Sequence, residues 1–199
     1  PFQQHRDIFY LSGIDQEESV LLLFPDAKNS NHREVLFVKK TNNHIAVWEG
    51  AKLSQKEATN ISGIQTVLWT DDFNSLFNQL TKEAKSIYFN TNEHYRANIE
   101  TQTREDRFIE WAKKKYPTHQ HEKSNFILQR LRSLKHKDEI CQIQQAIDIT
   151  EKGFRRVLDF VKPGVWEYEI EAEFVNEFIK NRSKGFAYSP IIASGQNNN

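Results

Sequence analysis

Two histidines two positions apart, His119 and His121, are the residues of this chain whose type and spacing come closest to a metal site. In an extended segment, side chains at positions i and i+2 point to the same side, so both imidazoles could reach one ion. A protein metal site needs further ligands, and the sequence near the pair supplies no third candidate. A solvated loop is therefore the better interpretation of the pair.

A run of glutamates opens one predicted helix: Glu167, Glu169, Glu171, Glu173 and Glu177. Carboxylates near a helix start compensate the helix dipole, so we interpret them as a solvated face rather than as general acids or bases.

Trp48 ends an apolar segment beside Glu49-Gly50. The commoner interpretation is that Trp48 is a core residue. The alternative is that it contacts a ligand at the end of a strand. The single cysteine, Cys141, cannot form an internal disulfide, which favours a reducing compartment. Its amphipathic context indicates a small core or boundary residue rather than a nucleophile.

Several function classes are disfavoured. The sequence has no metalloprotease helix with paired histidines, no glycine-rich phosphate loop, no Gly-x-Ser-x-Gly elbow and no paired cysteines. The formal net charge is +0 with interspersed signs, which argues against nucleic-acid and anionic-membrane partners. There is no apolar run of about 18 residues, so no membrane span is predicted. The absence of methionine and the abrupt start at Pro1 suggest a segment of a longer protein, with removal of an initiator methionine as the alternative.

The elements that would position these residues alternate between strands and helices. Apolar runs predict strands at 19–24, 34–39, 45–48, 66–69 and 86–89, the first three as an antiparallel meander. Helical spacing predicts helices at 73–80, 104–116 and 125–134, the first of them capped by Thr70-Asp71-Asp72.

Residues 135–138 are the plausible domain joint. A long apolar stripe after them predicts a helix at 140–161, ended by Pro163-Gly164, and a second helix follows at 167–182 with Gly185 near its C-cap. The last residues, 184–199, predict a strand that leads into a polar loop. The overall prediction is a mixed α/β domain followed by the beginning of another domain.

Five segments in order resemble motifs of Xaa-Pro aminopeptidases, the aminopeptidase P family: residues 1–13, 45–50, 131–140, 162–173 and 187–197. The first, Pro-Phe-Gln-Gln-His-Arg-Asp-Ile-Phe-Tyr-Leu-Ser-Gly, is similar to the family's Pro-Phe-Arg-Gln-x-x-Asp-Phe-x-Tyr-Leu-Thr-Gly. The fourth is similar to its Pro-Gly-x-x-Glu-Tyr-x-x-Glu-Ala-Glu helix entry, and the fifth to its Ser-Gly-x-Asn loop.

The resemblance implies an α/β fold. Residues 1–135 correspond to a creatinase/prolidase-like N-terminal domain, with a mixed sheet flanked by helices, that lacks its first strand. Residues 136–199 correspond to the first helices and strand of a truncated pita-bread metallopeptidase domain. His136-Lys137 stands where the family has Ser-Pro, which removes a favoured N-cap and N1 pair at a cost of about 1 kcal/mol.

The resemblance also implies a cytoplasmic metallo-aminopeptidase that removes the residue preceding proline, with two Mn²⁺ ions and a bridging hydroxide. The family's five metal ligands and its substrate-site histidine lie beyond Asn199. This chain alone is therefore expected to be inactive, to bind no Mn²⁺ and to contain no catalytic or metal-ligating residue. A metal-free pita-bread binding module, or a related dipeptidase or creatinase, is the alternative.

Three substrate-binding residues are carried over from the family. Trp48 matches a tryptophan that a neighbouring subunit lends to the active site, which implies a homo-oligomer assembled through the N-terminal domain. Arg104 matches an arginine of the same domain and suits the carboxylate end of a short peptide. Tyr188 is expected to line the pocket. The implied partners are proline-containing peptides, with no nucleic acid and no membrane.

Overall fold

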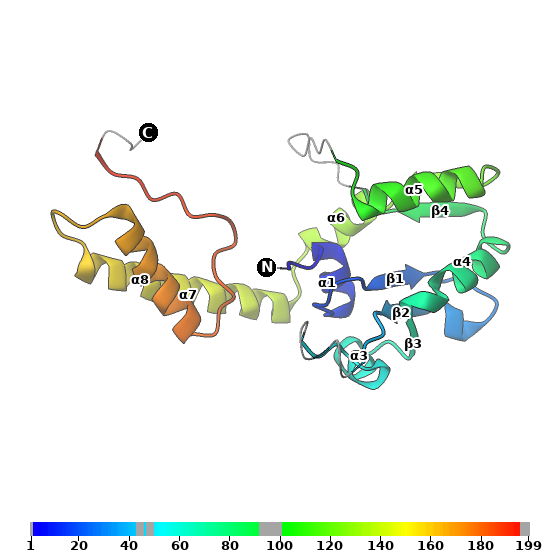
Figure 1. Ribbon diagram of the computed structural model, residues 1–199, viewed down its shortest axis with the longest axis horizontal. Helices are drawn as coiled ribbons and strands as arrows, with labels where there is room; N and C mark the ends of the chain where they lie inside the picture. Colours follow the sequence, from blue (N-terminus) through cyan, green and yellow to red (C-terminus); the bar gives the residue numbers. More distant parts are fainter. Residues whose placement is uncertain (1, 43–45, 47–49, 92–100, 196–199) are drawn as a thin grey trace. The chain divides into compact units, whose positions relative to one another are not determined.

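The computed structural model describes residues 2–42, 46, 50–91 and 101–195 (Figure 1). The chain divides into two compact units, unit 1 (Pro1–Leu131) and unit 2 (Arg132–Asn199). None of the helices in the described ranges combines the length and apolarity needed to cross a bilayer.

Unit 1 contains two small sheets. The first has the order β1-β2-β3, with β1 (Val20–Leu23), β2 (Glu34–Val38) and β3 (Thr66–Trp69). β1 runs antiparallel to β2, and β3 runs parallel to β2. The second sheet pairs β4 (Ser86–Phe89) in parallel with β5 (Gln120–Lys123). The predicted mixed sheet is confirmed.

The antiparallel pairing predicted for the first two strands is confirmed, but the three-stranded meander is wrong. β2 has β1 on one edge and β3 on the other, so neither edge is left for a meander partner. A parallel pair requires a crossover, which the helix α3 between β2 and β3 supplies. The predicted strand at 45–48 lies outside the described residues apart from Ala46, which is helical.

Five helices surround these sheets in the described part of unit 1: α1 (Arg6–Ser12), α3 (Gln55–Ser62), α4 (Phe73–Thr81), α5 (Arg104–Lys115) and α6 (Asn125–Ser133). Capping boxes begin α3 at Ser54 and α5 at Thr103. The cap predicted at Thr70-Asp71-Asp72 is not formed by a side chain. Those residues make a 3₁₀ turn instead, in which the Phe73 amide donates to the Thr70 carbonyl.

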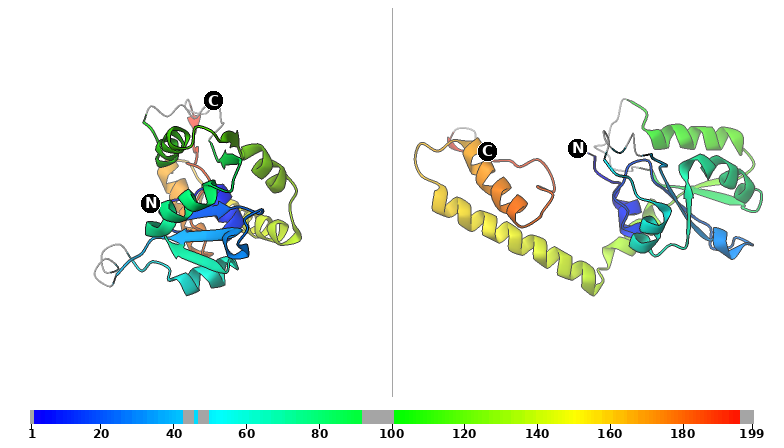
Figure 2. Two further views of the ribbon diagram at one scale, coloured as in Figure 1. Left: turned by 90° about the vertical axis from the view of Figure 1, so that its right-hand side faces the viewer. Right: turned by 60° about the horizontal axis from the view of Figure 1, so that its bottom comes forward.

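Alternate residues of β2 supply two cores, as the period of a strand requires. Leu36 and Val38 join a cluster with Ile14, Ala58, Ile64 and Val67, on the side of α1 and α3. Val35 and Phe37 pack on the other side against Leu76 and Leu80 of α4. The first sheet is therefore the middle layer between helices (Figure 2).

An aromatic cluster connects α4 to both sheets. Phe73 lies edge-on to Phe37 of β2 at 5.2 Å between ring centroids. It stacks on Phe77 at 5.4 Å and meets Phe108 of α5 at 5.5 Å. Phe77 and Phe108 in turn cover the second sheet, where Phe89 of β4 contacts Phe108. One short helix thus contributes to the packing of both sheets.

Unit 2 is a hairpin of α7 (Lys137–Phe160) and α8 (Glu167–Lys180). Phe154 of α7 lies edge-on to Phe174 of α8 at 4.9 Å, and Arg156 forms an ion pair with Glu173. Cys141 is exposed on α7, so the core or boundary position predicted for it is not what the described residues show.

The expected penalty at the start of α7 is offset locally. The Asp138 amide donates to Nδ1 of His136 at 3.4 Å, and the His136 amide donates to the carboxylate of Glu139 at 2.9 Å. The imidazole nitrogen takes the place of a serine oxygen as the acceptor, so the helix start predicted to lack a cap has a capping box.

Two predictions for the end of unit 2 are wrong. α8 ends at Lys180, within two residues of the predicted end, but its C-cap is Asn181 and not the region of Gly185. Arg182 has φ 63°, and the Arg182 and Ser183 amides donate to the carbonyls of Ile179 and Phe178. The tail predicted as a strand is irregular through residue 195. A strand needs a neighbour for its backbone groups, and the described residues of unit 2 supply none.

Gly153 sets how closely α7 and α8 approach, because a Cβ there would lie 2.8 Å from Cδ1 of Phe174. Gly153→Ala is expected to destabilise the protein by about 1–3 kcal/mol, despite the better helix propensity of alanine. Chemical denaturation followed by circular dichroism measures the change. Gln142→Ala, on an exposed position of the same helix, is the matched control and is expected to stay within about 0.5 kcal/mol. A Gly153→Ala protein as stable as the control would contradict this interpretation.

Candidate functional site

The three predicted substrate residues lie in different settings. Arg104 is the first residue of α5 and is exposed, directly after the capping residue Thr103. Tyr188 lies in the irregular segment after α8, with 77% of its surface exposed. Trp48 lies outside the described residues. Arg104 belongs to unit 1 and Tyr188 to unit 2.

Both flanks of the segment that contains Trp48 are held by three consecutive residues of unit 1. Lys39, before the segment, forms an ion pair with Glu18 at 3.0 Å. Lys52, after it, forms an ion pair with Glu17, and the Leu53 amide donates to the side-chain oxygen of Gln16 at 2.7 Å. No motif in the sequence marks these contacts, because their partners are far apart along the chain.

The Lys52–Glu17 pair is the more buried of the two. The Lys52 side chain is only 7% exposed, and its ammonium lowers the pKa of the Glu17 carboxyl by hydrogen bonding and by its charge. The backbone turns at Glu18, which adopts a left-handed conformation with φ 56°. This turn directs neighbouring carboxylates to lysines on opposite flanks of the same segment.

Asp7 is a second residue that the sequence analysis missed. It is 9% exposed in the first turn of α1, and its Oδ2 accepts from Nδ2 of Asn90 at 2.8 Å. Asn90 directly follows β4, so the bond ties α1 to the end of that strand. In the sequence, Asp7 looks like any aspartate near the start of a helix, so no local pattern distinguishes it.

The segment that carries Tyr188 is anchored on both sides. Phe186 packs on Phe178 at 4.9 Å between ring centroids. The backbone amide and the hydroxyl of Ser194 both donate to Oε1 of Glu167, at 2.8 and 3.1 Å. Tyr188 is therefore presented outward from a loop that is held at the beginning and the end of α8.

The glutamates of α8 are not simply a solvated face. Glu167 holds Ser194, Glu173 pairs with Arg156, and Glu177 accepts from the side chain of Asn181 at 2.8 Å. Each makes a structural contact that helical spacing alone does not reveal.

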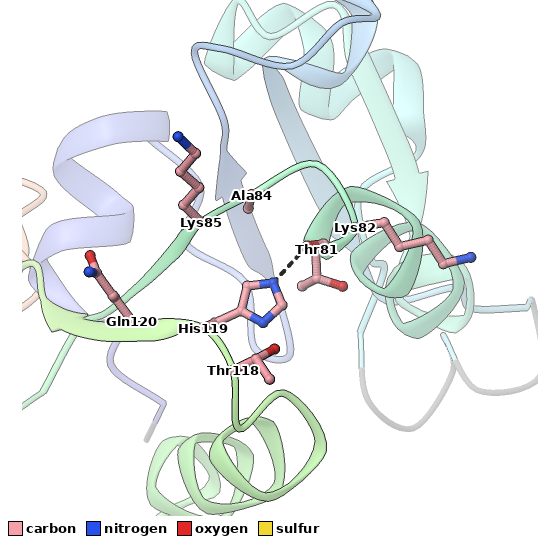
Figure 3. Close-up of a pocket in the computed structure, with 7 residues that line it drawn as sticks. All are labelled: Thr81, Lys82, Ala84, Lys85, Thr118, His119 and Gln120. Carbon is pink, nitrogen blue, oxygen red and sulfur yellow. Dashed lines mark hydrogen bonds between the residues drawn. The ribbon is translucent and has the colours of Figure 1, made fainter.

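The two histidines also differ from their predicted setting. His121 lies in β5 and stacks on Phe89 at 5.9 Å. Nε2 of His119 lies 2.7 Å from the Thr81 carbonyl oxygen in a shallow depression of about 450 Å³ (Figure 3). The side chains of Lys82 and Lys85 extend away from that ring. The solvated loop predicted for the pair is wrong because both rings pack against neighbouring elements.

Within the described ranges, no three His, Cys, Asp or Glu side chains gather closely enough to hold a metal ion. These residues therefore do not fit a dinuclear manganese centre.

Two family profiles match different parts of the chain. Residues 1–88 match the family profile "Aminopeptidase P, N-terminal domain", and residues 141–199 match "Metallopeptidase family M24". The chain is 25% identical to the Xaa-Pro aminopeptidase of Escherichia coli K12, covering 99% of this chain and 45% of that relative. It is 22% identical to the Xaa-Pro aminopeptidase of Haemophilus influenzae, covering 99% of this chain and 43% of that relative. The chain thus spans less than half of the length of these relatives.

Solved structures show the same fold. A Bacillus anthracis protein assigned to aminopeptidase P is 29% identical with a TM-score of 0.88, covering 98% of this chain and 46% of that chain. The Pseudomonas aeruginosa aminopeptidase PepP, at 24% identity, superposes with a TM-score of 0.82 over 99% of this chain and 44% of that chain.

Glu17→Gln is expected to destabilise the protein by about 1–3 kcal/mol, because it removes the carboxylate that the nearly buried Lys52 ammonium contacts. The pKa of Glu17 is lowered in the folded state, so its contribution is complete above the ordinary value of 4.5 and is lost as the pH falls through the lowered pKa. Denaturation of both proteins at a series of pH values should show the difference in stability shrinking on acidification. Glu18→Gln, in the more exposed pair, is the control and should cost less than about 1 kcal/mol. A difference between Glu17→Gln and the parent that stays constant down to pH 2 would refute this account.

Proposed function

We propose that this chain, which consists of an aminopeptidase P N-terminal domain and the start of an M24 metallopeptidase domain, is part of an Xaa-Pro aminopeptidase. The family predicted from the sequence motifs is confirmed by the two family matches, in the predicted order. The observation that carries the proposal is the 29% identical Bacillus anthracis structure, which follows this fold over 98% of the chain.

The domain boundary belongs to the same proposal, with residues 1–135 as the N-terminal domain and residues 136–199 as the beginning of the pita-bread domain. Two observations support a joint in this region. The contacts of the chain separate after Leu131, and His136 caps a new helix that begins at Lys137.

The proposed reaction is hydrolysis of the peptide bond between a first residue and a proline in second position. Two Mn²⁺ ions in the longer enzyme would supply the activated water. The described residues of this chain do not fit that centre, so the chain alone is proposed to be inactive. Its contribution lies in positioning and binding. A prolyl bond suits a dedicated site, because its nitrogen carries no N–H and its ring fixes φ.

Three side chains are proposed to contact the peptide. The indole of Trp48 offers a flat apolar face to a proline ring. The exposed guanidinium of Arg104 suits the carboxylate end of a short peptide. The outward position of Tyr188 on its anchored loop leaves its ring available to line a pocket. Trp48 is proposed to act in a neighbouring subunit, which makes the enzyme a homo-oligomer. The cytoplasm is its proposed location.

The longer protein, supplied with Mn²⁺, is expected to release the first residue from an Xaa-Pro-Xaa peptide. It should lose this activity on chelation and regain it when the metal is restored. An Xaa-Ala-Xaa peptide is the control and should be cleaved far more slowly. Amino-acid release measured by chromatography decides the question. Turnover only of Xaa-Pro dipeptides or of creatine would replace the proposed activity, and the absence of both turnover and metal binding would favour a binding module.

Trp48→Ala in the longer protein is expected to lower kcat/KM for Xaa-Pro peptides roughly three- to tenfold, because one aromatic contact to the substrate is lost. Its Tm should stay within about 2 °C of the parent. Trp69→Ala is the matched control: Trp69 packs on the Ile14 cluster of unit 1, so its replacement should lower the Tm. If Trp48→Ala lowers the Tm as much as Trp69→Ala, Trp48 is a core residue and its proposed role fails.

A further inference from the structure

The segment that follows α8 doubles back along that helix as a strap, defined here as residues 186–194. At one end of the strap, Phe186 packs on Phe178, near the end of α8, with ring centroids 4.9 Å apart. At the other end, the amide and the hydroxyl of Ser194 donate to Oε1 of Glu167, the first residue of α8. The strap therefore returns from the end of the helix to its beginning (Figure 1).

The contact at Ser194 restrains a strap that is longer than the distance it covers. Phe178 and Glu167 are eleven positions apart in α8, which corresponds to roughly 16 Å along the helix axis. The eight peptide units between Phe186 and Ser194 could extend over about 26 Å. Without the contact at its far end, the strap would have a slack of roughly 10 Å. The hydrogen bonds to Glu167 select one of the conformations that this slack allows.

The start of α8 does not depend on Glu167 for its cap. The Trp166 amide donates to Oε2 of Glu169 at 2.7 Å, so Glu169 provides the carboxylate of the capping box. The carboxylate of Glu167 instead accepts both donors of Ser194 on one oxygen, at 2.8 and 3.1 Å. Hydrogen bonds to an ionised carboxylate are roughly twice as strong as those between neutral groups. Two glutamates of one helical turn thus have separate tasks, one at the helix start and one on the strap.

Tyr188 depends on the strap for its position. Because 77% of its surface is exposed, packing within the described part of unit 2 does little to hold its ring. Tyr188 lies between Phe186 and Ser194, inside the part of the chain that the two contacts restrain. A side chain on a restrained backbone loses less conformational freedom when it contacts a ligand.

We propose that Glu167 is a positioning residue, which holds Ser194 and thereby fixes the strap and the place of Tyr188 at the peptide-binding site. This inference rests on the proposed function, in which Tyr188 contacts the peptide. Glu167 acts through the backbone that carries Tyr188 and does not itself contact the peptide. Its loss should therefore weaken peptide binding more than it slows the chemical step.

Steady-state kinetics of the longer protein, with Mn²⁺ and an Xaa-Pro-Xaa peptide, tests this role. Glu167→Ala is expected to raise KM about three- to tenfold and to change kcat by less than about twofold. Glu167→Gln keeps an oxygen that can accept from Ser194, so its KM should lie within about twofold of that of the parent. Glu171→Ala, at an exposed position of the same helix, is the matched control and should leave both constants unchanged. A KM for Glu167→Ala equal to that of the control would overturn the proposal.

A double substitution tests whether the effect passes through Ser194. Ser194→Ala removes one of the two hydrogen bonds and should raise KM less than Glu167→Ala does. Because Glu167→Ala already removes both bonds, the addition of Ser194→Ala should not raise KM further. If the two effects on KM multiply instead, Glu167 acts by another route and its positioning role through Ser194 fails.

Hydrogen exchange of the Ser194 amide separates this inference from the proposed function. The amide should exchange at least about tenfold faster in Glu167→Ala than in the parent and in Glu171→Ala, whether or not the peptide is cleaved. Unchanged exchange would mean that Glu167 does not hold the strap, which overturns the inference even if the parent is an active aminopeptidase. Faster exchange in a protein that cleaves no Xaa-Pro peptide supports the contact between Glu167 and the strap and refutes the proposed function.

Discussion

Phe73 contacts Phe37 of the first sheet on one side and Phe77 and Phe108 above the second sheet on the other. Aromatic pairs at these separations contribute about 0.5–1.5 kcal/mol each beyond the area that they bury. The two sheets share no hydrogen-bonded strand in the described part of the chain, so side-chain packing connects them, with the aromatic contacts of α4 beside the Asp7–Asn90 hydrogen bond.

Local sequence patterns predicted helices and strands well where apolar residues recur at helical spacing or form a run of strand length. β2 was predicted from its apolar run and α4 from Phe73, Leu76, Phe77 and Leu80, and both are confirmed. Predictions failed where the local structure depends on a segment that is distant in the sequence. The meander failed because α3 returns the chain parallel to β2, and the tail failed because a strand cannot exist without a neighbour. The His136 cap was missed because an imidazole replaced the expected hydroxyl.

The candidate site was less predictable for the same physical reason. Arg104, Trp48 and Tyr188 were predicted from family motifs and not from their chemistry. The contacts that hold their surroundings, such as Lys52 with Glu17 and Ser194 with Glu167, join residues far apart in sequence. Such pairs leave no periodic signal. They are nevertheless the interactions that hold the flanks of these two segments.

The apolar stripe of α7 shows what a hydrophobic pattern does and does not establish. Its period of about 3.6 residues predicted a helix correctly, and burial was the natural corollary. Yet Ile143, Phe154 and Leu158 are 45%, 56% and 72% exposed, although Phe154 also touches α8. Exposure of a long apolar face is costly in water, so the stripe is more apolar than its contact with α8 requires. Residues 141–199, which include most of this helix, match the family profile "Metallopeptidase family M24". The spacing of the apolar side chains predicts the helix, whereas the residues that pack against it are determined by the whole fold.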